Sequence, residues 1–352
     1  MTSFNADCLK LVREQRGLSQ TELALKLGVK QAVLSKYERG VIEPPIEMQD
    51  KISQTLDYPA VFFEQDVDFI SSGLIYHRKR ASLPAKIRDR IEAEARLRLM
   101  DILLLVSWQN TRVADVITSN GTSPEEVARQ LRREWGVPEG PISNLIDLLE
   151  AHNIIIVPFD FKTDKLDGFY IRLESGLVCI VLNSNEAFSP DRNRFTLAHE
   201  LGHVLLHNGI LPSRETEREA DTFASEFLMP EKMISSDMEM PITFNKLREL
   251  KAKWKVSIGS LIYRANKLEL ISPFVYRRLW TYMSSCGFRK KEPDCGLERE
   301  IPKLLITMIE TQGKCTDDLP AALHITQSVF AERYPHYNPL NNRSRSVRTE
   351  TT

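Results

Sequence analysis

The sequence has few cysteines, almost no net charge and no long apolar run, and each shortage excludes a class of protein. Its five cysteines are odd in number, and no pair has the Cys-x-x-Cys spacing. Neither a disulfide framework nor a cysteine zinc site is therefore indicated, and reduced thiols in a cytoplasm are the simplest interpretation. No apolar run could span a membrane, and the polar, acidic start is unlike a signal peptide. We expect a cytoplasmic protein with no membrane partner.

The charge balance excludes a general attraction to nucleic acid. The formal net charge is −1 at pH 7, so any contact with DNA must come from a local surface. At 352 residues, of which 42% are hydrophobic, the chain can form two or three globular units.

The most informative motif is His-Glu-x-x-His, formed by His199, Glu200 and His203. On a helix, positions i and i+4 lie one above the other, so the two imidazoles can bind one metal ion. The Glu beside the first His is then placed to act on water, which is the chemistry of zinc metallopeptidases. The alternative is a buried helix with two satisfied core histidines. The apolar neighbours fit a helix that forms the floor of a cleft.

A catalytic zinc ion takes three protein ligands and keeps one open position, so a third ligand should follow. Residues 214–230 predict a helix whose apolar face has Glu217 and Asp221 on its flank, one turn apart. We favour Glu217 over Glu219 as the ligand, with Asp221 holding the second nitrogen of a ligand His. Glu215 and Glu226 are interpreted as a solvated helix face.

A peptidase also needs a donor to the oxyanion that develops on the substrate. Tyr170, Arg192 and Arg194 are the candidates, and the sequence does not choose among them. The better interpretation of the two arginines is that they are surface charges.

A second motif lies near the N-terminus, where residues 8–57 are predicted to form five short helices. Ser19 with Glu22 makes a capping box at the start of the second helix. Gly28 supplies a turn, and Gly40 ends the third helix. Two short helices around a glycine turn indicate a helix-turn-helix.

The metal motif and the segment after it resemble the ImmA/IrrE family of metallopeptidases. The pattern is His-Glu-Leu-Gly-His-x-x-Leu-His, followed by Glu-x-Glu-Ala-Asp-x-Phe-Ala-x-x-Phe-Leu-Met-Pro. The resemblance implies zinc as the cofactor, His199, His203 and Glu217 as ligands, and Glu200 as the general base. His207 lies one turn further along, and we interpret it as a structural or substrate-side residue.

Residues 8–64 resemble the Xre/Cro-like repressor domain, in which the third helix enters the major groove of DNA. The resemblance implies double-stranded operator DNA as a partner and a homodimer, because one module reads a half-site. An alternative use of this domain is dimerisation or binding of a partner repressor. The implied base-facing residues are Gln31, Ala32, Ser35 and Lys36, and the implied phosphate contacts are Gln20, Lys30 and Arg39.

The expected fold is α+β and mostly α. We expect a five-helix Xre-type domain at residues 1–66 and a linker with a long helix at 67–120. A zincin-like metallopeptidase domain with a small sheet follows at 121–285. Residues 286–335 form a helical C-terminal region, and 336–352 a disordered tail. Segments 168–171 and 177–181 are the candidates for an edge strand that pairs with a substrate backbone.

Two functions remain open from the sequence. The first is a DNA-binding transcriptional regulator with a zinc-dependent endopeptidase domain. By the family resemblance it cleaves a specific repressor or antitoxin-like protein in response to stress or mobile-element signals. The second is a transcription factor whose zinc domain acts as a sensor or scaffold without proteolysis. The intact Glu200 favours the first, because a scaffold has no need of a general base.

Overall fold

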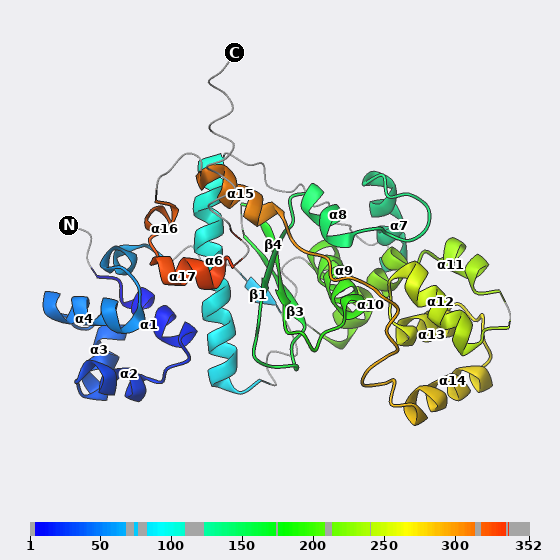
Figure 1. Ribbon diagram of the computed structural model, residues 1–352, viewed down its shortest axis with the longest axis horizontal. Coiled ribbons are helices and arrows are strands. Elements are labelled where there is room, and N and C mark those ends of the chain that lie inside the picture. Colours follow the sequence, from blue (N-terminus) through cyan, green and yellow to red (C-terminus); the bar gives the residue numbers. More distant parts are fainter. Residues whose placement is uncertain are drawn as a thin grey trace, which may run out of the picture. The chain divides into compact units, whose positions relative to one another are not determined.

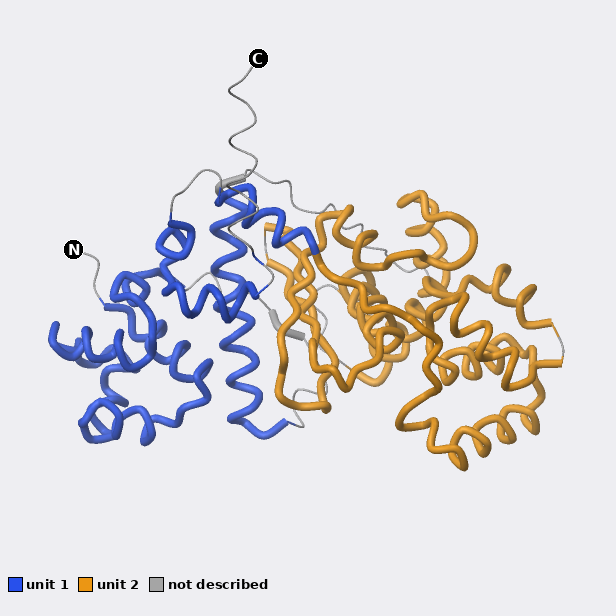
Figure 2. The backbone as a smooth tube through the Cα atoms, viewed as in Figure 1, with its two compact units in different colours: residues 1–74, 79–112, 303–352 blue, residues 75–78, 113–302 orange. Residues whose placement is uncertain are grey.

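The chain divides into two compact units, which Figure 2 shows in different colours. Unit 1 comprises residues 1–74, 79–112 and 303–352, and unit 2 comprises 75–78 and 113–302. The computed structural model describes residues 4–67, 74–76, 83–109, 123–173, 175–207, 213–239, 241–313, 318–335 and 337. Nearly all of the expected tail from residue 336 lies outside these. The predicted fold class is confirmed, because the two units are mostly helical and contain one small sheet. No helix in the described ranges has the length and apolarity to cross a membrane.

The N-terminal part of unit 1 is a bundle of short helices. They are α1 (Ala6–Gln15), α2 (Gln20–Leu27), α3 (Gln31–Glu38), α4 (Ile46–Leu56) and the 3-10 helix η1 (Ala60–Glu64). The predicted capping box is confirmed, since the side chains of Ser19 and Glu22 each accept a backbone N–H of the other residue. Gly28 ends α2 with a φ of 69°, a left-handed conformation that glycine adopts without strain.

The C-terminal segment of the chain packs on α6 (Ala85–Gln109), the long helix of unit 1. It contains α15 (Leu304–Gly313), α16 (Leu319–Ala322) and α17 (Gln327–Arg333). A buried guanidinium holds it there: Arg333 donates to Asp101 of α6 at 2.7 Å and to the Tyr58 hydroxyl at 2.5 Å. The sequence predicts one helical C-terminal region at 286–335. In the structure, residues 292–303 form no helix, and residues 303–335 belong to unit 1.

Unit 2 is built on a sheet with the strand order β1-β3-β4-β2. The strands are β1 (Leu74–Tyr76), β2 (Ile155–Phe159), β3 (Gly168–Arg172) and β4 (Val178–Asn183). β4 pairs parallel with β2 and antiparallel with β3, and all six of its residues are buried. The candidate edge strand at 177–181 is therefore wrong, because β4 lies inside the sheet. The candidate at 168–171 is wrong as well, because β3 lies inside the sheet between β1 and β4.

Helices cover the sheet and extend unit 2 beyond it (Figure 1). Those at or near the sheet are α7 (Pro124–Glu134), α8 (Leu145–Ala151), α9 (Pro190–Leu206) and α10 (Arg214–Leu228). The helices that follow are α11 (Glu231–Asp237), α12 (Phe244–Trp254), α13 (Ile258–Lys267) and α14 (Pro273–Ser285). One apolar core runs from β4 through α9 and α10 to α12 and α13. The core therefore fixes α9 between the sheet and α10.

Glu226 corrects one sequence-based interpretation. It is 1% exposed and does not lie on a solvated face. Its carboxylate pairs with Arg264 of α13, which is 2% exposed, and lies 3.3 Å from Arg129 of α7. Arg264 also donates to the carbonyl of Met229 at 3.1 Å. Glu226 therefore joins three helices of unit 2 through ionic contacts that the sequence pattern does not indicate.

We expect Glu226→Ala to lower the free energy of unfolding of unit 2 by about 3–5 kcal/mol, because it leaves Arg264 buried without its partner. Glu215→Ala is the matched control on the same helix. The Glu215 side chain is 61% exposed and, among the described residues, pairs with exposed Arg218 alone, so its removal should change stability by less than about 0.5 kcal/mol. Chemical denaturation of the two variants measures the difference. Equal midpoints for both would contradict a structural role for Glu226.

Candidate metal centre

The helix that carries the His-Glu-x-x-His motif is deeply buried. Pro190 opens α9 at a position where its missing N–H is not needed. Twelve of the 17 residues of α9 are buried, among them Glu200 and His203. α9 packs against β3 and β4 on one side and against α10 on another. The two histidines therefore project from a helix whose position is fixed by the core.

A glycine lets α10 approach the motif closely. A Cβ atom on Gly202 would lie 3.0 Å from the ring of Phe223 and 3.2 Å from the Cα of Ala220, both on α10. Contacts this short would force the helices apart. At its start α10 is fixed by Ser213 and Thr216, which form a reciprocal capping box. This close packing brings Glu217 to the histidines.

His199, His203 and Glu217 form one cluster in the described part of the chain. One ligand atom from each lies within 4.8 Å of the others. The Glu217 carboxylate is 3.5 Å from His203 Nε2 and 4.0 Å from His199 Nε2. The two Nε2 atoms are 3.0 Å apart. The structure thus brings together the three residues that the sequence predicts as ligands.

Each histidine is oriented through its other ring nitrogen. His199 Nδ1 lies 2.8 Å from the carboxylate of Asp221, as the sequence predicts. His203 Nδ1 lies 2.9 Å from Nδ1 of His207, whose Nε2 is 2.8 Å from the carboxylate of Glu219. Carboxylates that accept from ligand histidines fix the ring orientation in metal sites. His207 and Glu219 therefore position His203 in the way that Asp221 positions His199.

The chain His203–His207–Glu219 was not predicted from the sequence. A signal for it is present: His207 repeats the i+4 step after His203, and Glu219 lies two residues from Glu217. Two helical positions that are two apart point in different directions, so Glu217 and Glu219 cannot serve the same atom. In the structure Glu217 faces the two Nε2 atoms and Glu219 faces His207. This division of roles favours Glu217 as the ligand.

The electrostatics of the cluster favour a cation. Burial lowers the pKa of His199, but the hydrogen bond to Asp221 and the charges of Glu200 and Glu217 outweigh it, and the pKa is raised. Burial also lowers the pKa of His203, and there the hydrogen bond to Glu217 does not compensate. Carboxylates thus surround the two imidazoles, and the lowered pKa of His203 favours its neutral form. A neutral imidazole beside carboxylates is a suitable environment for a metal ion.

The donor set fits zinc. When His199 donates Nδ1–H to Asp221 and His203 donates Nδ1–H to His207, both Nε2 atoms turn lone pairs toward one point. Such lone pairs repel unless a cation lies between them. Two imidazole nitrogens and one carboxylate oxygen are a known ligand set of catalytic zinc. The 3.0 Å between the nitrogens is near the separation of about 3.3 Å that two tetrahedral Zn–N bonds imply.

Some of the polar residues near the cluster face the histidines, and others form contacts elsewhere in unit 2. Glu200 is 1% exposed and acts electrostatically on His199. Tyr170 of β3 is buried with its ring centroid 6.3 Å from that of His203. Arg192, by contrast, pairs with Asp167 at 2.6 Å and is half exposed.

Arg194 corrects the interpretation of this residue as a surface charge. It is 2% exposed, pairs with Glu300 and donates to the carbonyl of Ile142 at 2.8 Å. Its side chain is therefore used to hold α9 against neighbouring segments of unit 2. Tyr170 is the remaining nearby candidate for a donor to a developing oxyanion.

The predicted DNA-reading helix is α3, and its outward residues lie as expected. Gln31, Ala32 and Lys36 are exposed, and Ser35 is half-buried. Lys30 and Arg39, which flank α3 as its caps, are exposed as well. The surface of α3 thus offers amide, hydroxyl and basic groups together.

The side chain of Gln20, for which the sequence implies a phosphate contact, forms two hydrogen bonds within the protein. Its side chain accepts from Gln31 at 2.7 Å and donates to Glu38 at 2.8 Å. Glu38 is buried and forms an ion pair with Arg13 at 2.5 Å. The chain of contacts from Arg13 to Gln31 fixes the side chain at the start of α3 before any DNA is present.

Two family models match the parts of the chain that contain these two regions. Residues 9–63 match the helix-turn-helix family model, and residues 149–266 match the model of the IrrE N-terminal-like domain. The first range contains α2 and α3, and the second contains β2 to β4 and the whole metal cluster.

Individual relatives resemble parts of the chain. It is 42% identical over 52 residues to Antitoxin HipB of Escherichia coli K12, which is 15% of this chain and 59% of the antitoxin. The same protein of the O6:H1 strain matches over 55% of its length. An uncharacterized immunity region protein 2 of Bacillus phage phi105 is 29% identical over 115 residues, 30% of this chain and 70% of that protein. The chain thus spans little more than half the length of the antitoxins it matches.

The two family matches follow each other in the order that the sequence motifs predict. The second is to a metallopeptidase family, and the cluster of His199, His203 and Glu217 lies within it. The chain therefore carries an Xre-like helix-turn-helix domain followed by a peptidase domain of the ImmA/IrrE family.

Proposed function

We propose that the chain is a DNA-binding transcriptional regulator whose unit 2 is a zinc-dependent endopeptidase. Its substrate is a specific repressor or antitoxin-like protein, cleaved in response to a stress or mobile-element signal. The observation that carries the proposal is the convergence of the two Nε2 atoms and the Glu217 carboxylate beside the buried Glu200. A site that held zinc only for structure would need no general base and would close the fourth position.

The residues of the site have separate tasks in peptide hydrolysis. Zinc, when bound by His199, His203 and Glu217, polarises the scissile carbonyl and lowers the pKa of water. Glu200 takes a proton from the attacking water and delivers it to the leaving amine. Burial strengthens the electrostatic effect of Glu200, because little solvent screens it. Asp221, together with the His207–Glu219 pair, keeps both ligand rings in the required orientation.

The relatives support a regulatory role rather than a digestive one. Both named relatives, an antitoxin and a phage immunity region protein, are regulatory by their names. A peptidase joined to a DNA-binding domain is directed to one place and one kind of partner. We infer that the helix-turn-helix unit binds operator DNA as a homodimer, since one α3 reads a half-site.

The first prediction of this proposal concerns zinc. Purified protein should contain about one equivalent of zinc per chain by elemental analysis. His199→Ala and Glu217→Ala each remove a ligand and should abolish retention of the metal.

Glu219→Ala is the matched control for Glu217→Ala, because both change a glutamate of the same helix turn. Glu219 bonds to His207, so its removal should leave zinc bound and lower the affinity by about 10–100-fold. Retention with Glu217→Ala and complete loss of zinc with Glu219→Ala would reverse the assignment of the third ligand.

The second prediction concerns cleavage. Co-expressed with repressors encoded near its own gene, the wild type should make a single cut in one partner once a stress signal is present. It should leave casein intact. Glu200→Gln spares all ligands and should slow that cut by about 10²–10⁴-fold, since it removes the base.

Zinc content and DNA binding of Glu200→Gln serve as controls for its folding. If that variant cuts and regulates like the wild type, the enzyme function is wrong. The sensor or scaffold function then takes its place.

The third prediction concerns α3. The isolated segment 1–64 should retard DNA from its own promoter region in a gel. Gln31→Ala combined with Lys36→Ala should abolish the retardation, because each base contact contributes about 1–3 kcal/mol. Glu47→Ala with Glu64→Ala, outside α3, is the control pair. Binding without any sequence preference at physiological salt would favour the use of this domain in protein contacts.

A further inference from the structure

The positive charge of the chain is concentrated in one part of unit 2. Residues 244–291 contain twelve lysines and arginines but only two acidic residues, Glu249 and Glu269. This segment of 48 residues carries +10, whereas the whole chain carries −1. It comprises α12, α13, α14 and the turn that follows. A charge density of this kind attracts polyanions.

Part of this charge is neutralised within the protein. Lys251 pairs with Asp191 at 3.0 Å and with Glu292 at 2.9 Å, and Lys253 pairs with Asp237 at 2.7 Å. The remaining exposed cations of α14 and the turn have no carboxylate partner among the residues that the structure describes. They are Arg277, Arg278, Arg289, Lys290 and Lys291.

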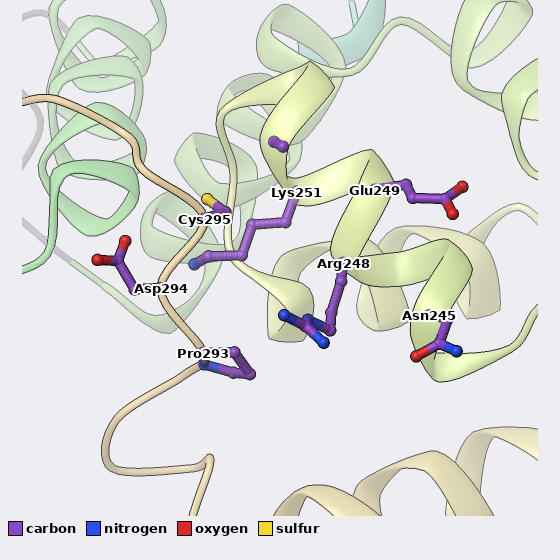
Figure 3. A pocket seen from close by; sticks show the side chains of 8 residues that line it. Asn245, Arg248, Glu249, Lys251, Pro293, Asp294 and Cys295 are labelled. Atoms are coloured by element: carbon purple, nitrogen blue, oxygen red, sulfur yellow. The ribbon is translucent and has the colours of Figure 1, made fainter.

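Two hollows open on this segment, and they differ in charge. One, of about 480 Å³, lies between α12 and residues 293–295 (Figure 3). Figure 3 shows Lys251 extending toward that segment, where Asp294 lies, and Glu249 is on the same helix. The positive charges that line this hollow are therefore offset by carboxylates, so the hollow attracts a polyanion only weakly.

The other hollow has about 660 Å³ and no carboxylate in its lining. Arg277 and Arg289 bring two guanidinium groups to it, and the Arg289 guanidinium lies 4.9 Å from the centre of the Trp280 ring. A guanidinium presents a planar fork of N–H donors that matches the oxygens of a phosphate. The lining is completed by aromatic and hydroxyl side chains. They are Tyr276, Trp280, Thr281 and Ser284.

Exposed aromatic rings accompany the basic groups. In the described residues, the large aromatic side chains that stay exposed are Tyr263, Phe274 and Tyr282, at 50%, 65% and 46%. All three lie on α13 and α14. Among these rings, Phe274 has the Arg278 guanidinium 6.0 Å from its centre. An exposed ring beside an arginine is a stacking platform for unpaired bases, while the bases of a duplex are stacked inside it and cannot reach such a ring. The aromatic rings therefore favour a single strand over a duplex.

We propose that α14 and residues 288–291 bind single-stranded nucleic acid, with phosphates at Arg277 and Arg289 and bases stacked on the exposed rings. This surface is separate from α3, which serves duplex DNA in the proposed function. The ligand class follows from the combination of unpaired cations, a hollow free of carboxylates and exposed aromatic rings.

Fluorescence anisotropy of a labelled 20-nucleotide oligothymidylate with the full chain tests the proposal. The double variant Arg277→Glu/Arg289→Glu should bind at least about tenfold more weakly. Its slope of log affinity against log salt should fall by about 0.7 for each phosphate that the variant no longer neutralises. Lys165→Glu/Lys232→Glu makes the same change of net charge at exposed positions elsewhere in unit 2 and should bind like the wild type.

A second variant separates stacking from charge. Phe274→Ala removes an exposed ring at no change of charge, so it should weaken binding while the salt slope stays constant. Oligouridylate in place of oligothymidylate distinguishes RNA from DNA as the preferred strand. Unchanged melting temperatures confirm that the variants are folded.

Three results would overturn the proposal. The first is wild-type affinity of the Arg277→Glu/Arg289→Glu variant. The second is an equal decrease in affinity for a duplex of the same length, which would make the surface a duplex contact. The third is displacement of the oligonucleotide by polyglutamate at equal charge concentration, which would indicate an acidic protein partner.

Discussion

The close contact between α9 and α10 at Gly202 sets the geometry of the metal centre. A side chain there would meet Phe223 and the backbone of Ala220, so the two helices could not approach. All of the site chemistry depends on this approach, because α9 brings His199, Glu200 and His203 while α10 brings Glu217 and the carboxylates behind the rings. The candidate ligands lie on helices, not loops, and the apolar core around α9 holds both helices.

How much of this the sequence reveals depends on whether a feature is local. The motif on α9, the capping box at Ser19 and the strand segments β2 to β4 follow from spacing and residue type, and the structure contains all of them. The order of the strands does not follow, since it depends on pairing between distant segments. The placement of β3 and β4 inside the sheet, for which edge positions were candidates, is an example.

The buried charges were the hardest feature to predict. Glu226 and Arg194 look like ordinary charged helix residues in the sequence, yet each is buried against a partner far along the chain. In the same way Arg333 reaches Asp101 across more than two hundred residues. A helical pattern tells which positions face inward only when they are apolar. It gives no sign of a buried arginine whose carboxylate comes from elsewhere.

These buried pairs share a structural logic. Replacing such a pair by well-packed apolar residues often costs nothing, so its presence is a weak argument for stability. Removing one partner is costly, however, because the other charge is left in the core. Any packing that separates Arg13 from Glu38, or Arg333 from Asp101, therefore incurs the same penalty. We interpret the pairs as a means of favouring one docking of helices over its alternatives within each unit.

For the proposed peptidase, the charge distribution also bears on how general proteolysis in a crowded cell is avoided. The candidate site residues lie among carboxylates, whereas the excess positive charge is gathered on α12 to α14. Long-range attraction of polyanions would thus act at α12 to α14 and not at the carboxylate-rich cluster of His199, His203 and Glu217. In the proposed function, selection of a protein substrate would then rest on short-range contacts near β3 and α9, which only a matching segment can make. Such contacts act at the distance of a hydrogen bond, so they discriminate between segments by shape and donor pattern more than by charge.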